Sequence, residues 1–166
     1  MGKASRRKAA SRTRVLLSAT ESRLKSLGVD TPVVVQRDLP QAQKISNALS
    51  KILESEVEEA ISLDEYRHRL NAIVLAWNLS LLPPERQAKT LKDLGDFVEK
   101  TDPFGALAAQ EVILRLMEKK RAMFPNDKRH IISYDVQFIG NKVHVTAAAL
   151  SAPEQVHTLL GWRTHG

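Results

Sequence analysis

The sequence predicts an α+β fold, in which a bundle of about five helices is followed by one C-terminal β-hairpin packed on the helices and a short terminal helix. Two observations lead to this prediction. Between residues 41 and 124, apolar residues recur with a period near 3.6, as they do on one face of a helix. After Pro125 the period changes to two, which is typical of strands that bury alternate side chains. The 166 residues suffice for one domain with a hydrophobic core.

The chain is predicted to divide into three parts. Residues 1–28 form a basic N-terminal arm with a weak helix, residues 29–40 a proline-containing connector, and residues 41–166 a single globular domain. Val33–Val35 could form a short strand in the connector. Within the domain we expect helices at about 41–60, 63–82, 84–100 and 103–124, a hairpin at 130–150, and a helix at 152–160.

Capping residues and prolines place the helix boundaries. Ser62 and Glu65 have the spacing of a capping box, Pro83-Pro84 ends one helix and starts the next, and Asp102-Pro103 starts another. The predicted core stripes of the four helices are Ile45, Leu49, Ile52, Leu53 and Val57; Leu63, Tyr66, Leu70, Ile73, Val74, Trp77 and Leu81; Ala88, Leu91, Leu94 and Val98; and Leu107, Val112, Leu114, Leu116, Met117 and Phe124. These stripes contain almost no polar residue, which argues against an active site among the helices.

Gly140-Asn141 is a two-residue hairpin turn signal. Counting outward from this turn pairs residue 138 with 143, 136 with 145, 134 with 147, and 132 with 149. One face of the hairpin is then entirely apolar or aromatic and must lie on the helices, because an isolated hairpin is marginal in water. That face consists of Ile132, Tyr134, Val136, Phe138, Val143, Val145, Ala147 and Ala149.

Several classes of function are disfavoured by what the sequence lacks. Without cysteine there is no disulfide framework, thiolate catalysis or cysteine-based metal site. No H-E-x-x-H pattern or glycine-rich phosphate loop occurs, so we predict no catalytic residues, metal ligands or cofactor. The longest apolar run, around Ala76–Leu82, is too short to span a bilayer. These features favour a cytoplasmic protein, or a mitochondrial matrix protein if the Arg- and Ser-rich N-terminus is a transit peptide.

The positive charge of the chain is concentrated at its N-terminus. Residues 1–25 carry eight Lys/Arg and one acidic residue, which gives +7, whereas the remainder sums to −1. The predicted anion-contacting residues are Lys3, Arg6, Arg7, Lys8, Arg12 and Arg14. No aromatic residue precedes Tyr66, so the arm cannot stack on bases. We therefore expect a non-enzymatic interaction protein whose arm contacts nucleic acid, a ribosome or an acidic protein surface without sequence specificity.

Alternative interpretations remain open at this stage. The arm could be only a solvated tail, with the body forming a homo-oligomer through spare apolar surface such as that around Trp162. A ligand-binding protein or enzyme would have its site between the hairpin and the helices. Lys128, Arg129 and His130 could form a secondary anion site, or simply flank a turn. On the polar hairpin face, Ser133, Asp135 and His144 could form a catalytic constellation, although a solvated outer face is the simpler interpretation.

Overall fold

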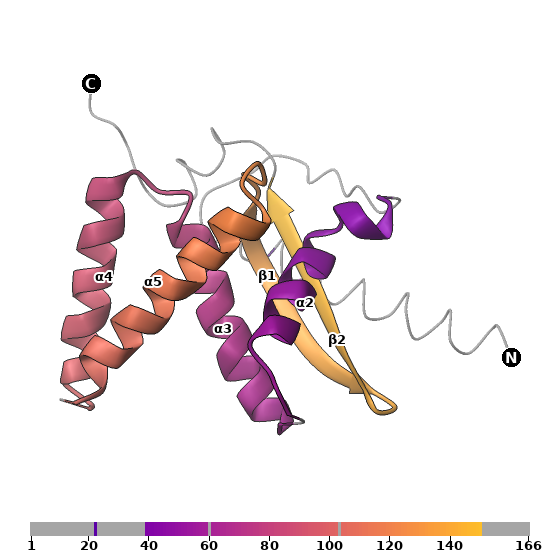
Figure 1. Ribbon diagram of the computed structural model, residues 1–166, viewed down its shortest axis with the longest axis horizontal. Helices are drawn as coiled ribbons and strands as arrows, with labels where there is room; N and C mark the ends of the chain where they lie inside the picture. Colours follow the sequence, from indigo (N-terminus) through magenta and orange to yellow (C-terminus); the bar gives the residue numbers. More distant parts are fainter. Residues whose placement is uncertain (1–21, 23–38, 60, 103, 151–166) are drawn as a thin grey trace, which may run out of the picture.

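The computed structural model describes residues 22, 39–59, 61–102 and 104–150 (Figure 1). In chain order, this part contains the 3₁₀ turn η1 (Gln41–Gln43), the helices α2 (Ile45–Ser55), α3 (Leu63–Leu79), α4 (Pro84–Glu99) and α5 (Gly105–Met123), and the strands β1 (His130–Ile139) and β2 (Lys142–Leu150). The α+β class is confirmed, but the described residues hold four α-helices rather than about five. The weak helix expected within residues 1–28, the strand at Val33–Val35 and the helix at 152–160 lie outside the described residues.

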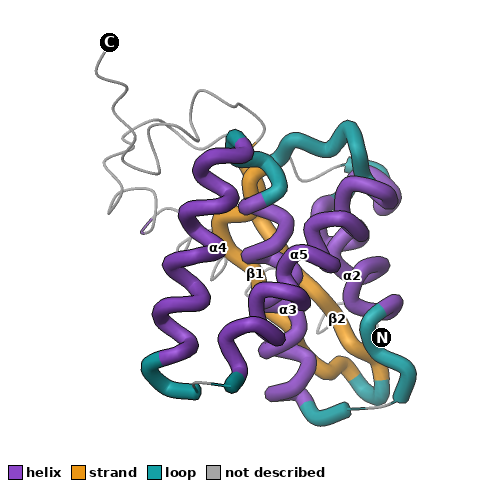
Figure 2. The backbone as a smooth tube through the Cα atoms, turned by 60° about the vertical axis from the view of Figure 1, so that its left-hand side comes forward, coloured by secondary structure: helices purple, strands orange, loops and turns teal. Residues whose placement is uncertain are grey.

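The elements pack in layers that start from the hairpin. β1 and β2 form a two-stranded antiparallel sheet, and its apolar face is covered by α3 over β1 and by α2 over β2. On the other side of the core, α5 packs on α3, and α4 packs on α5. Figure 2 shows α4 and α2 on opposite sides of the molecule. The hairpin therefore completes a helical core, as the sequence predicts.

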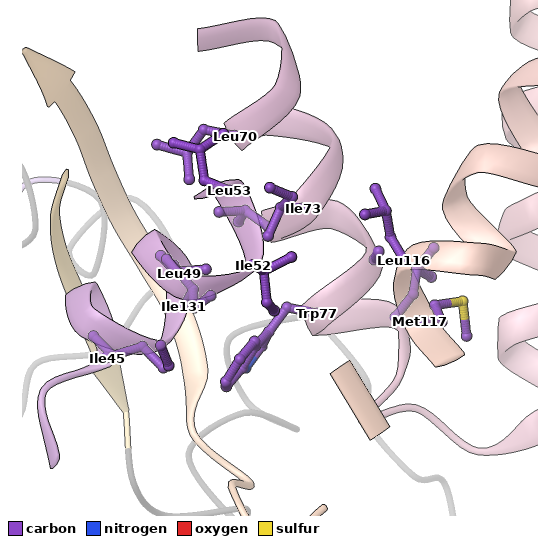
Figure 3. Packing of buried hydrophobic residues seen from close by; sticks show 14 of the residues in the cluster. Ile45, Leu49, Ile52, Leu53, Leu70, Ile73, Trp77, Leu116, Met117 and Ile131 are labelled. Atoms are coloured by element: carbon purple, nitrogen blue, oxygen red, sulfur yellow. The ribbon is translucent and has the colours of Figure 1, made fainter. Parts of the chain in front are cut away.

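Helix α3 is central to the core and begins as its sequence predicts. Ser62 Oγ accepts a hydrogen bond from the Glu65 N–H at 3.2 Å, and the Glu65 carboxylate accepts one from the Ser62 N–H at 2.8 Å. This reciprocal pair is the capping box. Farther along α3, Trp77 is completely buried. Figure 3 shows its side chain directly below Ile52 of α2, with Leu116 and Met117 of α5 to the right.

The predicted core stripe of α5 was partly wrong. Leu107, Val112 and Leu114 are exposed, by 74%, 40% and 46%, and Ala88 of α4 is exposed as well. The residues that α5 does bury are Ile113, Leu116, Met117 and Lys120. Their spacing of three, one and three places them on one narrow stripe, and the three exposed residues lie at other angles around the helix. Lys120 is the one buried polar residue in the described part of the chain, which agrees with stripes that are almost free of polar residues.

Helices α4 and α5 approach closely at Gly95, which is the buried residue of α4. The Gln110 side-chain amide of α5 donates to the Leu91 carbonyl at 2.9 Å, and a Cβ on residue 95 would lie 2.2 Å from Gln110 Nε2. The glycine therefore leaves room for a hydrogen bond between the two helices. Leu91 and Leu94 pack on the core only in part.

The hairpin register is as predicted near the turn and shifts beyond Ser133. Phe138 pairs with Val143, Val136 with Val145, and Tyr134 with Ala147, but Ala149 pairs with Ile131 rather than with Ile132. An irregularity between Ile131 and Ser133 adds Ile132 as an extra residue, as in a β-bulge. Phe138 is also 43% exposed rather than buried. At the turn, Gly140 has φ 65°, which suits the first central position of a type II′ turn.

The side chain of Asn78 on α3 binds the backbone of β1 beside the bulge. Asn78 Nδ2 donates to the Ile131 carbonyl at 3.0 Å, and its Oδ1 accepts from the Ile131 N–H at 2.9 Å. Both backbone groups of Ile131 are thus bonded to α3 rather than to β2. Ile131, only 3% exposed, joins the main core cluster, and Ile132 is buried as well, as predicted.

Candidate functional site

The six predicted anion-contacting residues of the N-terminal arm lie outside the described residues. The structure therefore places none of them, and their role stays a prediction. The structure does show which charged residues of the body contact other groups of the protein. Cations without such contacts are the ones available to an anionic partner.

The predicted secondary anion site, Lys128, Arg129 and His130, does not form a set of converging cations. Arg129 forms a two-point ion pair with Asp127, through Nε at 2.9 Å and Nη2 at 2.5 Å, and its Nη1 donates to the Gln43 carbonyl at 2.7 Å. All three guanidinium nitrogens are thus engaged. Lys128 is exposed and His130 is half-buried at the start of β1. Anion binding at this loop stays a prediction, and it rests mainly on Lys128.

Asp127 is held as a carboxylate by this arrangement. Burial raises its pKa, but the hydrogen bonds from the Arg129 side chain and N–H, together with the positive charge of Arg129, lower the pKa overall. The Asp127–Arg129 pair also fixes the loop that leads into β1, because Arg129 binds the Gln43 carbonyl of η1. It therefore joins this loop to the start of the described globular part.

Lys120 is the buried ionisable residue that the sequence analysis missed. Its side chain is 3% exposed, its Nζ lies 5.0 Å from the centre of the Trp77 ring, and it donates to the Asp127 carbonyl at 2.7 Å. Burial is the largest cause that lowers the pKa of Lys120, and repulsion by Lys128 adds to it. A signal was present, because Lys120 follows Leu116 and Met117 at helical spacing.

Trp77 ties this polar cluster to the core. Its indole N–H donates to the Arg129 carbonyl at 2.8 Å, and its ring packs against Phe124 at a centroid distance of 5.7 Å. Lys120 and Arg129 therefore bond to carbonyls and to Asp127 within the protein. Since Lys120 is so little exposed, its amine is not presented to a substrate. The cluster, which consists of Trp77, Lys120, Asp127 and Arg129, holds α3, α5 and the loop before β1 together.

A second polar cluster joins the end of α2 to α5. The Glu56 carboxylate accepts two hydrogen bonds from Arg115, at 3.0 and 2.7 Å, and one from Lys119. The Glu56 side chain is 9% exposed, and the Arg69 guanidinium of α3 donates to its backbone carbonyl. Burial raises the pKa of Glu56, but the hydrogen bonds and charges of Arg115 and Lys119 together lower it.

We expect Glu56→Gln to lower the free energy of unfolding at pH 7 by about 1–3 kcal/mol, because Arg115 and Lys119 lose their anionic partner. A lowered carboxylate pKa stabilises the fold at pH values above the ordinary glutamate pKa of about 4.3, and this contribution is lost as the pH falls through the folded-state value. The variant should therefore lose less stability than the natural chain on acidification below about pH 4.3. Urea unfolding at pH 7 and pH 3 measures both effects.

The matched control for this prediction is Glu54→Gln. Glu54 is exposed on the same helix and has no side-chain ion pair in the described part of the chain. If Glu54→Gln and Glu56→Gln change the acid sensitivity equally, the Glu56 cluster does not have the role assigned to it.

The polar face of the hairpin shows no catalytic arrangement around Asp135. As predicted, Asp135 lies opposite Thr146 and Gln137 opposite His144. The Asp135 carboxylate accepts hydrogen bonds from the Val136 N–H at 2.8 Å and the Gln137 amide at 2.6 Å. No described hydrogen bond joins Asp135 to His144, which is exposed.

Most cations of the described body are engaged by other groups of the protein. Each of its arginines has an interaction partner: Arg67 with Asp64, Arg69 and Arg115 with Glu56, Arg121 with Gln87, Arg129 with Asp127, and Arg86 with a further contact. Six lysines of the described part have no side-chain hydrogen bond or ion pair there: Lys44, Lys51, Lys89, Lys100, Lys128 and Lys142. They lie in helix α2 or just before it, in helix α4 or just after it, in the loop before β1, and in β2.

Within residues 39–59, 61–102 and 104–150, no group of three or more His, Asp or Glu side chains could hold a metal ion. No helix in the same part is long and apolar enough to cross a membrane. Searches against protein-family models, curated proteins and solved structures find no match for this chain. The proposal for its function therefore rests on the charge distribution and the contacts described above.

Proposed function

We propose that this chain is a non-enzymatic interaction protein whose basic N-terminal arm binds nucleic acid through its phosphates, without sequence specificity. The observation that carries the proposal is the division of positive charge. The arm concentrates a net charge of +7 in 25 residues, whereas the rest of the chain sums to −1 and the described body engages its arginines in internal contacts. The body then serves as a neutral platform that carries the arm.

Phosphate binding by such an arm has a physical basis in counterion release. Lysines and arginines that neutralise phosphates free condensed cations, so affinity falls steeply with salt. Because no aromatic residue precedes Tyr66, the arm lacks the rings on which bases stack. Binding should therefore depend on charge and on ionic strength, and little on base sequence.

The test compares two variants with equal losses of charge. The arm variant replaces Lys3, Arg6, Arg7, Lys8, Arg12 and Arg14 with glutamine. The body variant replaces Lys44, Lys51, Lys89, Lys100, Lys128 and Lys142 with glutamine. Fluorescence anisotropy with a labelled single-stranded RNA of mixed sequence measures the affinity at fixed salt. We expect the arm variant to lose affinity by more than about tenfold, and the body variant to lose much less, because the lysines of the body belong to a part of the chain whose net charge is −1.

Equal losses in the two variants would contradict the proposal, as would equal affinity of the arm variant and the natural chain. No binding by the natural chain would identify the arm as a solvated tail. The thermal unfolding of both variants serves as a control for loss of folded structure. A loss confined to the body variant would be followed by Lys128→Gln alone, which tests the secondary anion site.

A further inference from the structure

The two edges of the hairpin differ in a way that the proposed function does not explain. In a two-residue hairpin, the pair beside the turn exchanges both hydrogen bonds, and the outward-facing backbone groups belong to every second residue. The turn is Gly140-Asn141, so the outward-facing residues of β1 are Tyr134, Val136 and Phe138. Those of β2 are Val143, Val145, Ala147 and Ala149.

The edge of β1 is blocked at several points. Asn78 occupies the N–H and carbonyl of Ile131, and the Asp135 carboxylate accepts a hydrogen bond from the Val136 N–H. The bulge at Ile132 also interrupts the regular spacing of the strand. Side-chain blocks, inserted residues and charges are means by which proteins prevent a strand edge from pairing with another chain.

The edge of β2 has none of these features. Within the part of the chain that the structure describes, no hydrogen bond reaches the outward-facing groups of Val143, Val145, Ala147 or Ala149. The nine residues of β2 include no proline and no acid, and Lys142, beside the turn, is their one Lys/Arg. β2 is thus the edge at which an added strand can form a regular ladder of hydrogen bonds.

We propose that β2 pairs antiparallel with β2 of a second copy of this chain, so that two hairpins form one four-stranded sheet about a two-fold axis. The outward-facing residues are symmetric about Thr146, which places the axis there. Val143 then faces Ala149 of the second copy, and Val145 faces its Ala147. All outward-facing groups of both β2 strands are matched in this register.

Two features favour a second copy over another occupant. Antiparallel self-pairing places Lys142 opposite the uncharged Leu150, so no like charges meet across the new ladder. In addition, the outer strands of the four-stranded sheet are the β1 strands of the two copies, and the outer edge of each is blocked. The pairing is therefore closed, and it produces a dimer rather than a filament. The proposal is independent of the function of the arm.

The experiment uses the full chain and two variants of β2. Thr146→Lys places two lysines face to face at the axis, where like charges directly opposite each other oppose pairing, while within one copy the new lysine faces Asp135. Val145→Pro removes an outward-facing N–H and leaves the ladder with β1 intact. Gln137→Lys is the matched control, because it adds the same charge to the polar face of the blocked strand β1.

Sedimentation velocity over a dilution series should show a monomer–dimer equilibrium for the natural chain and for Gln137→Lys. At least a tenfold weaker association, or none, is expected for Thr146→Lys and for Val145→Pro. Hydrogen exchange gives the second readout. The amides of Val143, Val145, Ala147 and Ala149 should become more protected as the concentration of the natural chain rises, whereas the amides of His144 and Thr146 should be protected at all concentrations.

Three results would overturn the proposal. One is a natural chain that stays monomeric over the whole series. Another is a dimer that both β2 variants leave unchanged, which would place the interface elsewhere. The third is protection of the outward-facing amides that does not depend on concentration, because another segment of the same chain would then cover the edge. Circular dichroism spectra test whether each variant is folded. If Val145→Pro does not fold, the concentration-dependent hydrogen exchange of the natural chain tests the proposal in its place.

Discussion

Trp77→Ala is expected to lower the free energy of unfolding by about 3–5 kcal/mol. Trp77 is completely buried, and besides filling space in the core it makes specific contacts with three other residues. Its indole N–H bonds the Arg129 carbonyl, its ring packs on Phe124, and Lys120 lies over its face. The alanine variant loses this packing and leaves the Arg129 carbonyl without its donor. Urea unfolding monitored by circular dichroism at 222 nm (a general helix signal) measures the change.

Two variants control for the cause of that loss. Trp77→Phe keeps an aromatic ring but removes the indole N–H, so it should cost less than Trp77→Ala. Leu75→Ala removes a large side chain from the same helix at a position that is 36% exposed, and it should cost much less than Trp77→Ala. If Trp77→Ala were no more destabilising than Leu75→Ala, Trp77 would not tie the polar cluster to the core as described.

Asn78→Ala is expected to lower the free energy of unfolding by about 2–4 kcal/mol, a large effect for so small a truncation. The reason is that Asn78 bonds both the N–H and the carbonyl of Ile131, a residue that is 3% exposed. Removal of the amide leaves a buried donor and a buried acceptor unsatisfied at once. Chemical denaturation measures the loss, and the Ile131 amide should exchange faster with solvent.

Asn71→Ala is the matched control for this substitution, because Asn71 is exposed on the same helix and has no side-chain hydrogen bond in the described part. It should change the stability by less than about 0.5 kcal/mol. A small effect of Asn78→Ala, with unchanged exchange at Ile131, would show that Ile131 finds other partners and that Asn78 does not hold the bulge.

Local sequence signals predicted the elements whose causes are local. The capping box at Ser62 and Glu65 depends on four consecutive residues, and the Gly140-Asn141 turn sets the pairing of its neighbours through Tyr134 and Ala147. Both signals act within a few residues, so the sequence alone contains what is needed to interpret them.

The features that the sequence did not predict depend on distant contacts. The Asn78 side chain, which binds Ile131 beside the bulge, lies more than fifty residues earlier in the chain. Lys120 is buried because Trp77 and the Asp127 carbonyl give its ammonium group a partner on each side. Leu107 and Leu114 are exposed because α5 meets α3 and α4 on a different stripe. The spacing of Lys120 from Leu116 and Met117 was a local signal of its burial, but no local period indicates the bulge or the exposed leucines.

The basic arm, in contrast, could be predicted from the sequence alone. The basic arm is a matter of composition, and counting charges was enough to predict it. What the sequence could not show is that the arginines of the body are engaged, since Arg115 meets Glu56 and Arg129 reaches Gln43 only in the folded chain. This second observation is what makes the arm the concentrated source of positive charge.

The salt dependence of RNA binding tests the central claim most directly, because it counts the phosphates that are neutralised. For single strands, the logarithm of the binding constant falls with the logarithm of salt concentration by about 0.7 per phosphate contact. If all six arm residues are engaged, we predict a slope of about −4 for the natural chain and for the body variant. The arm variant should give a slope near zero. Equal slopes for the natural chain and the arm variant would contradict the account.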